Sequence, residues 1–275
     1  NGILVGPYET ATAHTCWDGK PPRWDYESEL EPNELDRIMP WLEKATERLP
    51  LFGKTGVKSI ISGAITHTPD GVYLSGPAHG APNYWMHCGA SIGICQGGGA
   101  GKYLAQWMVH GQAEINMREF DPRRFGPWAT KDYTAEVSIA DYHHMYYCYK
   151  PAEQHTVGRG LRKSALHDTL AKHGAQFAQI FGWERARWYD RSGEGETYSF
   201  RRSNWWNAVK DEALAVRERV GLMDLSTFSK FEVTGKDAFA FLNRICANKV
   251  PEKDGGIILT HLLNENGFIE SELTI

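Results

Sequence analysis

Long apolar runs are missing from this sequence. No stretch of its 275 residues approaches the ~18–20 apolar residues of a membrane-spanning helix, so no membrane span is expected. A basic tract is missing too, because 30 Lys and Arg residues are interspersed with 34 Asp and Glu residues for a net charge of −4. Since binding of nucleic acid needs clustered positive charge, the composition predicts no nucleic-acid partner.

Cysteine is scarce. The five cysteines are Cys16, Cys88, Cys95, Cys148 and Cys246. Their spacing fits no zinc-ligand pattern, and an odd number argues against a disulfide framework, so we expect no metal site and buried, inert thiols. His143 and His144 are adjacent and would point in different directions on a regular element, which favours packing or surface roles over metal binding.

Apolar residues make up 41% of the sequence and charged residues 23%, as is typical of globular domains. There is no internal repeat, no low-complexity tract and no signal-peptide pattern. The chain begins with a strand-like run without methionine and ends inside another strand-like run. We therefore expect a segment of a longer protein.

The most informative stretch is rich in glycine and leads into an expected helix over residues 102–110. It is not a phosphate loop, because Tyr103 follows Gly101-Lys102 where Ser or Thr is needed and Gln96 occupies the first glycine position. It is not a dinucleotide fingerprint either, since the third glycine position falls on Lys102. A glycine-rich turn before a helix offers bare backbone and free N–H groups to a planar or anionic ligand. Close helix packing without a ligand is the alternative.

Neighbouring motifs extend this pattern. Residues 66–77 read THTPDGVYLSGP, residues 83–85 read NYW, and residues 89–107 read GASIGICQGGGAGKYLAQW. In order and spacing they resemble the C-terminal part of the flavin-binding domain of the amine oxidase and dehydrogenase family, especially its dimethylglycine and sarcosine dehydrogenases. The resemblance implies that the glycine loop, residues 89–94, lies against the ring of FAD. It also implies that the N-terminus of the following helix faces the N1–C2=O edge of the ring.

The cofactor-binding residues implied by the resemblance are those of the glycine loop and one glutamine beyond it: Gly89, Ala90, Ser91, Ile92, Gly93, Ile94 and Gln96. Some relatives place a lysine after the last glycine of the loop, where Gln96 offers only a neutral donor. Lys102 is expected on the surface. A cysteine linkage to the flavin is excluded, because Gly63 occupies that position, and His67 is interpreted as a loop histidine without another role.

The remaining motifs extend the resemblance over essentially the whole chain. Residues 121–126, DPRRFG, are similar to the family's closing motif for the flavin domain, although a solvated surface turn explains the two arginines equally well. RGLRKSALHDTL at 159–170 and GAQFAQIFGWERARWY at 174–189 resemble the segment that joins the flavin and folate halves. Residues 223–250 are similar to the start of a glycine-cleavage-type aminomethyltransferase domain.

We therefore expect a mixed α+β and α/β fold in three parts. Residues 1–127 are the C-terminal part of an FAD-dependent oxidoreductase domain, 128–198 a connecting central segment, and 199–275 the N-terminal part of a folate-binding aminomethyltransferase domain. Periodicity and turn signals predict helices over 32–48 (kinked or split at Pro40), 164–173, 207–220 and 236–246. Strands are expected over 3–5, 57–65 and 231–233, and around a turn within 257–275.

One residue of the last part carries a chemical prediction. In aminomethyltransferases an aspartate after the N-x-x-G turn acts near the reactive nitrogens of folate, and Glu272 corresponds to it by resemblance. A glutamate keeps the carboxylate with one more methylene, so a proton-transfer or cation-stabilising role is chemically retained. The alternative is a solvated strand residue.

The resemblance implies FAD-dependent oxidative demethylation of dimethylglycine, with the one-carbon unit passed to tetrahydrofolate. The electron acceptor would be oxygen or an electron-transfer flavoprotein, in the bacterial cytoplasm or the mitochondrial matrix. One alternative is the same chemistry on sarcosine or another N-methyl amine. The other is a non-catalytic fragment or binding module, if the protein consists of these residues alone.

Overall fold

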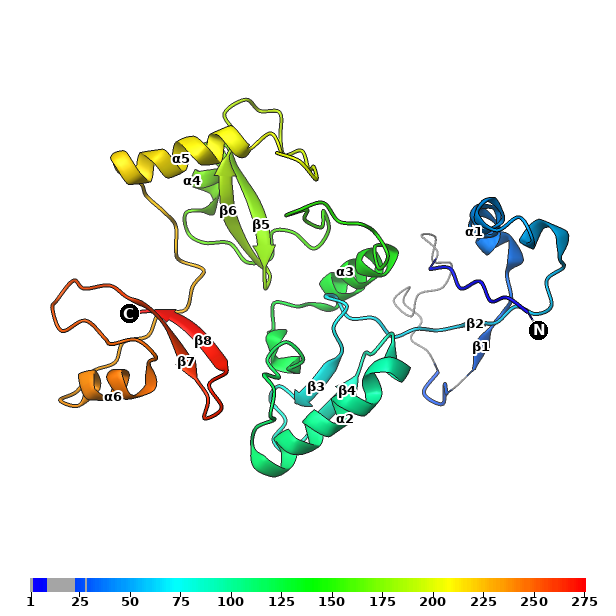
Figure 1. Ribbon diagram of the computed structural model, residues 1–275, viewed down its shortest axis with the longest axis horizontal. Coiled ribbons are helices and arrows are strands. Elements are labelled where there is room, and N and C mark those ends of the chain that lie inside the picture. Colours follow the sequence, from blue (N-terminus) through cyan, green and yellow to red (C-terminus); the bar gives the residue numbers. More distant parts are fainter. Residues whose placement is uncertain (1, 9–22, 28) are drawn as a thin grey trace. The chain divides into compact units, whose positions relative to one another are not determined.

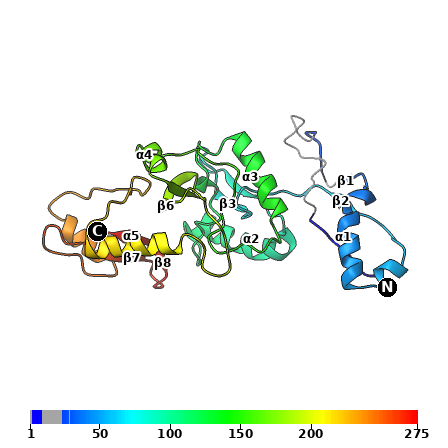
Figure 2. The same cartoon turned by 90° about the horizontal axis from the view of Figure 1, so that it is seen from above.

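The computed structural model describes residues 2–8, 23–27 and 29–275, so Cys16 lies outside the described residues. The chain divides into two compact units, Asn1–Thr227 and Phe228–Ile275, which are considered separately. Within the described residues every sheet consists of two antiparallel strands, with helices beside them (Figure 1; Figure 2). The mixed helix and strand composition agrees with the expected fold class.

The first part of unit 1 departs from the predicted elements. Helix α1 covers Leu35–Arg48, and strand β1, Leu30–Glu31, pairs with β2, Ser62–Gly63. Of the predicted kink or split at Pro40, the split is wrong, because α1 is one helix although proline removes one of its backbone hydrogen bonds, and the kink stays a prediction. The strands predicted over 3–5 and 57–65 are also wrong, apart from β2, since a strand needs a paired neighbour and these residues have none in the described chain.

The second part is a hairpin covered by a helix. Strands β3, Leu74–Pro77, and β4, Trp85–Cys88, are antiparallel, and helix α2, Gly93–His110, packs along them (Figure 1). The predicted helix start at Lys102 is wrong by nine residues. An internal glycine costs only about 1 kcal/mol against alanine, while each residue added to an existing helix gains a hydrogen bond. The glycines after the loop are therefore helical, and α2 ends at Gly111 with φ +77°.

The 3₁₀ turn η2, Pro122–Arg124, packs on β3, and helix α3, Lys131–His143, follows it. The Thr130 hydroxyl caps α3 by accepting a hydrogen bond from the Tyr133 amide. Tyr133 and Val137 are buried on the inner side of α3. Gly158, with φ +64°, lies so close to them that a Cβ there would be 2.3 Å from a Val137 methyl carbon.

The last part of unit 1 is a second hairpin with two helices. Strands β5, Ala175–Ile180, and β6, Trp183–Tyr189, pair next to the short helix α4, His167–Lys172. Helix α5, Trp206–Glu218, contacts β6. The helices predicted over 164–173 and 207–220 are confirmed in type, although each is shorter.

Unit 2 contains helix α6, Ala238–Ile245, and the hairpin of β7, Leu259–Leu263, with β8, Ile269–Thr274. The predicted helix and hairpin are therefore confirmed. Thr260 is fully buried and accepts a hydrogen bond from the Asn248 amide, which fixes the hairpin to the segment after α6. The half-buried strand predicted over 231–233 is wrong, because it has no partner strand among the described residues and Phe231 is 88% exposed.

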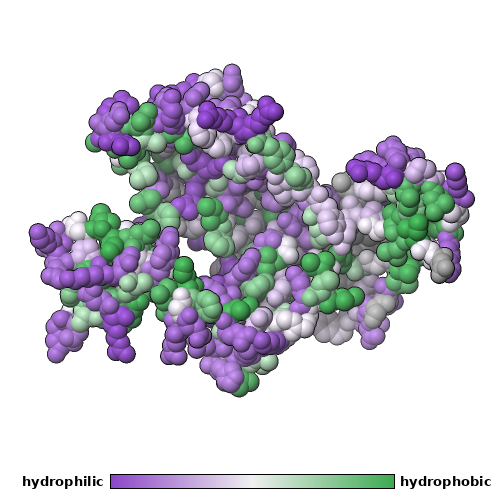
Figure 3. Space-filling model, viewed as in Figure 1, coloured by the Kyte–Doolittle hydropathy of each residue, from purple (hydrophilic) through white to green (hydrophobic). Residues whose placement is uncertain are grey.

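Apolar side chains are exposed in several places on the face drawn in Figure 3. The expectation of buried cysteines is wrong for Cys88, Cys95 and Cys148, which are exposed, and right for Cys246. None of the helices in the described ranges combines the length and apolar composition that crossing a bilayer requires.

Candidate functional site

The glycine loop begins where β4 ends. Gly89 has φ +79°, and a Cβ on it would lie 2.8 Å from the Thr68 methyl carbon. Both the left-handed backbone and the close neighbour require glycine here. Because glycine has no side chain, a flat ligand could approach the backbone on the side away from Thr68.

Helix α2 starts inside the loop, at Gly93. No side chain of the described residues caps this end, where Ile92 is the N-cap residue. The Cys95 amide donates to the Ile92 carbonyl at 3.2 Å, so the amides of Gly93 and Ile94 are the ones that point outward with the positive end of the helix dipole. Ile92 and Ile94 are exposed beside them, and Ile94 entirely so. The uncapped amides and the apolar side chains fit a planar, largely apolar ring with a partly negative edge.

The structure thus brings the seven predicted cofactor residues together on one turn and the first turn of α2. Because α2 starts at Gly93 and not at Lys102, the amides of its first turn lie four residues after Gly89 instead of thirteen. Gln96 lies in the first turns of α2 and is half-buried. Lys102 is exposed and pairs with Glu114, so its predicted surface position is confirmed.

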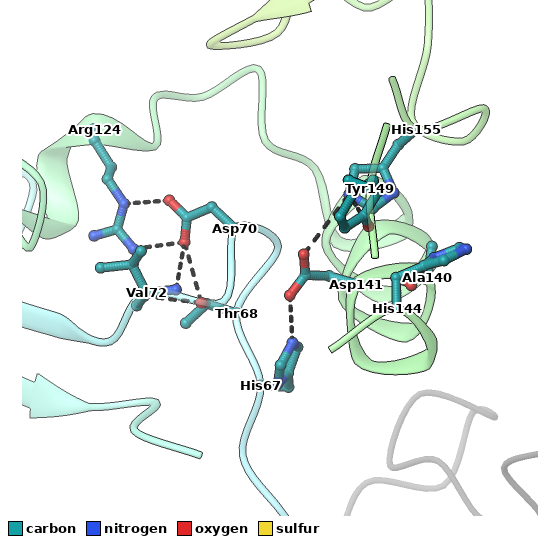
Figure 4. Close-up of polar contacts among 10 residues, drawn as sticks. All are labelled: His67, Thr68, Asp70, Val72, Arg124, Ala140, Asp141, His144, Tyr149 and His155. Atoms are coloured by element: carbon teal, nitrogen blue, oxygen red, sulfur yellow. Dashed lines mark hydrogen bonds and ion pairs between the residues drawn. The ribbon is translucent and has the colours of Figure 1, made fainter. Parts of the chain in front are cut away.

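The segment of residues 67–72 lies directly under the loop, because Thr68 contacts Gly89. Asp70 binds Arg124 through both carboxylate oxygens, at 2.7 Å from Nε and 2.9 Å from an NH2 nitrogen (Figure 4). Arg124 also donates to the Val72 carbonyl at 2.6 Å. Of the two arginines in DPRRFG, Arg124 is therefore buried and holds this segment, whereas Arg123 is half exposed and pairs with Asp121.

A second carboxylate binds the same segment from α3. The Nε2 atom of His67 lies 2.6 Å from Oδ2 of Asp141, and Nε2 of His155 lies 3.7 Å from the other oxygen (Figure 4). The His67 side chain is only 7% exposed. His67 lies in a loop, as interpreted, and the structure adds that its ring is buried and paired with Asp141.

Two opposing effects act on Asp141. Burial alone would raise its pKa, but the hydrogen bonds and charges of His155 and His67 outweigh burial and lower the pKa to about 2. Asp141 is thus a carboxylate at any physiological pH. An ionised acceptor makes the short hydrogen bond to His67 a strong one.

Aromatic rings surround the outer side of this pair. The Tyr149 hydroxyl lies 3.4 Å from Nε2 of His155, and burial, then the charges of Asp141 and Glu153, raise the pKa of Tyr149 to about 12. His144 donates from Nδ1 to the Ala140 carbonyl at 2.7 Å and packs edge-on against Tyr147. His144 therefore has a packing role at the end of α3. No group of three or more His, Cys, Asp or Glu side chains in the described residues is arranged to hold a metal ion.

A separate cavity of about 510 Å³ lies beside β5 and α4. Arg159 and Glu184 form its central ion pair, and the Gly160 amide also donates to Glu184. Burial would raise the pKa of Glu184, but Arg159 and the Gly160 amide outweigh it, so the pKa is lowered. Glu196 in the same wall is paired with Arg187. Its acidic groups are thus already neutralised within the protein.

Glu272 lies in unit 2, on β8. It is directly opposite His261 of β7, and Nε2 of His261 lies 3.2 Å from a Glu272 carboxylate oxygen. The Glu272 side chain is 61% exposed, which leaves its other oxygen open to a ligand. The structure therefore adds a cross-strand histidine next to the carboxylate predicted from the sequence.

Three residues of these sites were missed in the sequence: Asp141, His155 and His261. His67 and Asp141 are 74 positions apart, so no local spacing relates them. His261 and Glu272 are partners across a hairpin, but the register shifts between Leu262 and Leu263, so the predicted turn alone would have paired His261 with Ser271.

Comparison with known proteins gives two matching family models. The "FAD dependent oxidoreductase central domain" matches residues 110–164, and the "GCVT N-terminal domain" matches residues 166–275. The predicted order, a flavin oxidoreductase part followed by an aminomethyltransferase part, is thereby confirmed. The predicted boundaries at 127/128 and 198/199 stay predictions.

Similar proteins cover the whole chain. Rat mitochondrial dimethylglycine dehydrogenase is 35% identical over 100% of this chain and 33% of its own length. Human mitochondrial sarcosine dehydrogenase is 31% identical over 85% of this chain and 29% of its own length. The mouse mitochondrial pyruvate dehydrogenase phosphatase regulatory subunit is 30% identical over 100% of this chain and 32% of its own length. The chain spans about a third of the length of these relatives.

Proposed function

Because the chain belongs to the dimethylglycine and sarcosine dehydrogenase family, we propose that it is part of an FAD-dependent oxidoreductase that demethylates an N-methyl amine. The observation that carries this proposal is the uncapped N-terminus of α2 beside the bare backbone of Gly89. The glycine loop lies before the two matched domains in the sequence, which cover residues 110–164 and 166–275.

In this proposal FAD supplies the acceptor for a hydride from the N-methyl group. The chain's own part is to hold the ring and to stabilise charge. Gly89 would let the loop backbone approach the bound ring, and the exposed Ile92 and Ile94 would offer it apolar surface. The amides at the start of α2 would hold negative charge, and so would favour the state in which the cofactor carries more of it.

For the substrate we propose dimethylglycine, with sarcosine as the nearest alternative. The support is that relatives described as dimethylglycine and sarcosine dehydrogenases match this chain at 35% and 31% identity. An unprotonated amine must come close to the hydride acceptor in either case.

We further propose that unit 2 contributes to a tetrahydrofolate site that receives the one-carbon unit. The match to the aminomethyltransferase-type domain and the half-exposed Glu272 support this step. The electron acceptor would be oxygen or an electron-transfer flavoprotein, and the compartment the mitochondrial matrix or the bacterial cytoplasm. The two relatives described as mitochondrial dehydrogenases support the mitochondrial compartment.

A non-catalytic role is the second candidate, and a specific observation favours it. The mouse relative named as a regulatory subunit of a phosphatase matches the whole chain at 30% identity. Family membership alone therefore does not decide between catalysis and binding. Bound flavin that a substrate can reduce would decide for catalysis.

The experiment uses the protein expressed from its complete reading frame. Purified protein is mixed without oxygen with dimethylglycine, sarcosine or glycine, and flavin absorbance is followed. The proposal expects bleaching by an N-methyl amine and none by glycine. Adding tetrahydrofolate should divert the released carbon from formaldehyde to a folate adduct. Absence of bleaching by any N-methyl amine would contradict the enzyme proposal and favour the binding role.

A further inference from the structure

We infer that Asp141 is a positioning residue for the glycine loop and acts through His67 and Thr68. The inference deepens the proposed function and rests on it, because it concerns the same flavin site. It assigns to α3, which lies in the matched central domain, a direct influence on the loop that would hold the cofactor.

The first step is the dependence of His67 on Asp141. The ring is buried, and its Nδ1 atom has no hydrogen-bond partner among the described residues. Its Nε2 atom donates to Asp141 at 2.6 Å, and the edge-on contact with Tyr142 adds only packing. Without Asp141, both ring nitrogens would be buried and unpaired. The ring would then have to move toward water, since an unpaired buried polar group is costly.

The second step is transmission along the segment of residues 67–72. Thr68 is 6% exposed, and its methyl group touches the position where Gly89 would carry a side chain. Gly71 donates its amide to the Thr68 carbonyl, and a Cβ on Gly71 would lie 2.8 Å from Oδ2 of Asp141. The turn is therefore held between the Asp141 carboxylate and the glycine loop. A shift of the turn away from the Asp141 carboxylate must therefore also shift the glycine loop, because closely packed groups leave no free space between them.

The turn of residues 67–72 has a second attachment, so the positioning effect of Asp141 can be separated from an effect on folding. The same turn is also held by the ion pair of Asp70 with Arg124, from the other side. Figure 4 shows Asp70 bound to Arg124 and Asp141 bound to His67, so loss of Asp141 leaves the turn attached through Asp70 and displaces it. The charged and titratable groups around Asp141 are His67, His155 and Tyr149. None of these can replace a carboxylate as acceptor for the His67 N–H at this position.

The test compares Asp141→Ala and Asp141→Asn with the matched control Asp132→Asn in the protein from the complete reading frame. Asp132 is exposed in the first turn of the same helix and lies outside the site. Flavin content, the visible flavin spectrum, kcat, KM and thermal unfolding are measured for each. Asp141→Ala should retain flavin with an altered spectrum and lose about 100-fold in kcat, the effect of a misplaced reacting group. KM should change much less.

The conservative variants keep the inference falsifiable if Asp141→Ala is insoluble. Asp141→Asn still offers an oxygen to the His67 N–H and should lose less activity than Asp141→Ala. His67→Gln places an amide N–H near the position of Nε2 and should retain the native spectrum, whereas His67→Phe cannot donate and should resemble Asp141→Ala.

The outcomes are distinguishable. Flavin-loaded protein in which all Asp141 and His67 variants match Asp132→Asn in spectrum and kcat would overturn the inference and leave the proposed function intact. Equal losses in His67→Gln and His67→Phe would also overturn it, because donation to Asp141 would then be irrelevant. Wild-type protein without flavin would overturn the proposed function and the inference with it.

Discussion

Asp70 and Arg124 are 54 positions apart and form a two-point ion pair, with contacts of 2.7 and 2.9 Å. The Arg124 side chain is only 7% exposed and also donates to the Val72 carbonyl. This pair joins the segment under the glycine loop to the turn η2. It is the contact by which the end of the flavin-domain motif holds the proposed cofactor site in place.

Replacing Arg124 should therefore destabilise the protein. Arg124→Gln leaves the Asp70 carboxylate without its cation, and we expect a loss of about 2–3 kcal/mol in the free energy of unfolding. Arg123→Gln is the matched control, since Arg123 is half exposed and pairs only locally; its loss should stay below about 1 kcal/mol. Denaturant unfolding of both variants checks the difference, and equal losses would contradict it.

Gly89→Ala should disturb the loop specifically. The left-handed backbone (φ +79°) and the 2.8 Å approach of Thr68 both oppose a side chain, so flavin content should fall. Thr68→Ser removes the opposing methyl group and should restore part of the loss in the double variant. Gly101→Ala, at a helical position with no atom within 4 Å, should instead stabilise the protein by about 0.5–1 kcal/mol.

If Gly89→Ala binds flavin as well as the wild type, Gly89 is not part of the site. Flavin released by acid from equal amounts of each purified variant provides the measurement.

Acid should weaken the contact of α3 with the segment of residues 67–72. The pKa of Asp141 is lowered from 3.8 to about 2, so its ionisation stabilises the folded state above pH 3.8 by about 2 kcal/mol. This stabilisation is lost as pH falls from 3.8 toward 2. Asp141→Asn should therefore show a flatter dependence of unfolding free energy on pH between 4 and 2. Parallel curves for the variant and wild type would show that the carboxylate carries no such contribution.

Glu272 should act only on the folate side. Glu272→Gln removes the negative charge beside His261, and we expect formaldehyde release in place of transfer to tetrahydrofolate. Oxidation of the amine, measured as the bleaching of the flavin absorbance, should proceed at the wild-type rate. Glu272→Asp keeps the carboxylate and should retain transfer. Unchanged transfer in Glu272→Gln would make Glu272 a solvated strand residue.

The sequence predicted well where a signal is local. The hairpin of β7 and β8 follows from two strand-like runs on either side of the tight turn Asn264–Gly267, which places Gly267 at φ +80°. The start of α2 was misplaced because glycine density outweighed the helical context. The strand expected over 57–65 has a partner only at Ser62 and Gly63, and pairing is not encoded in the strand itself.

The motif predicts the position of the cofactor loop, and the structure places its residues on one turn and the first turn of α2; that they bind the cofactor stays a prediction. The contacts below it were not predictable, because His67 meets Asp141 only after α3 packs against the segment of residues 67–72. Asp70 and Arg124 lie in separate motifs, and no spacing rule relates them. Long-range polar contacts of this kind depend on tertiary packing, and a single sequence carries no direct sign of them.

The most direct test is the visible spectrum of the protein from its complete reading frame, recorded before and after an N-methyl amine is added without oxygen. An oxidised flavin spectrum that bleaches with dimethylglycine or sarcosine, and not with glycine, is the predicted result. Colourless protein that takes up no FAD, or a flavin spectrum that no N-methyl amine changes, would contradict a flavin-dependent demethylase.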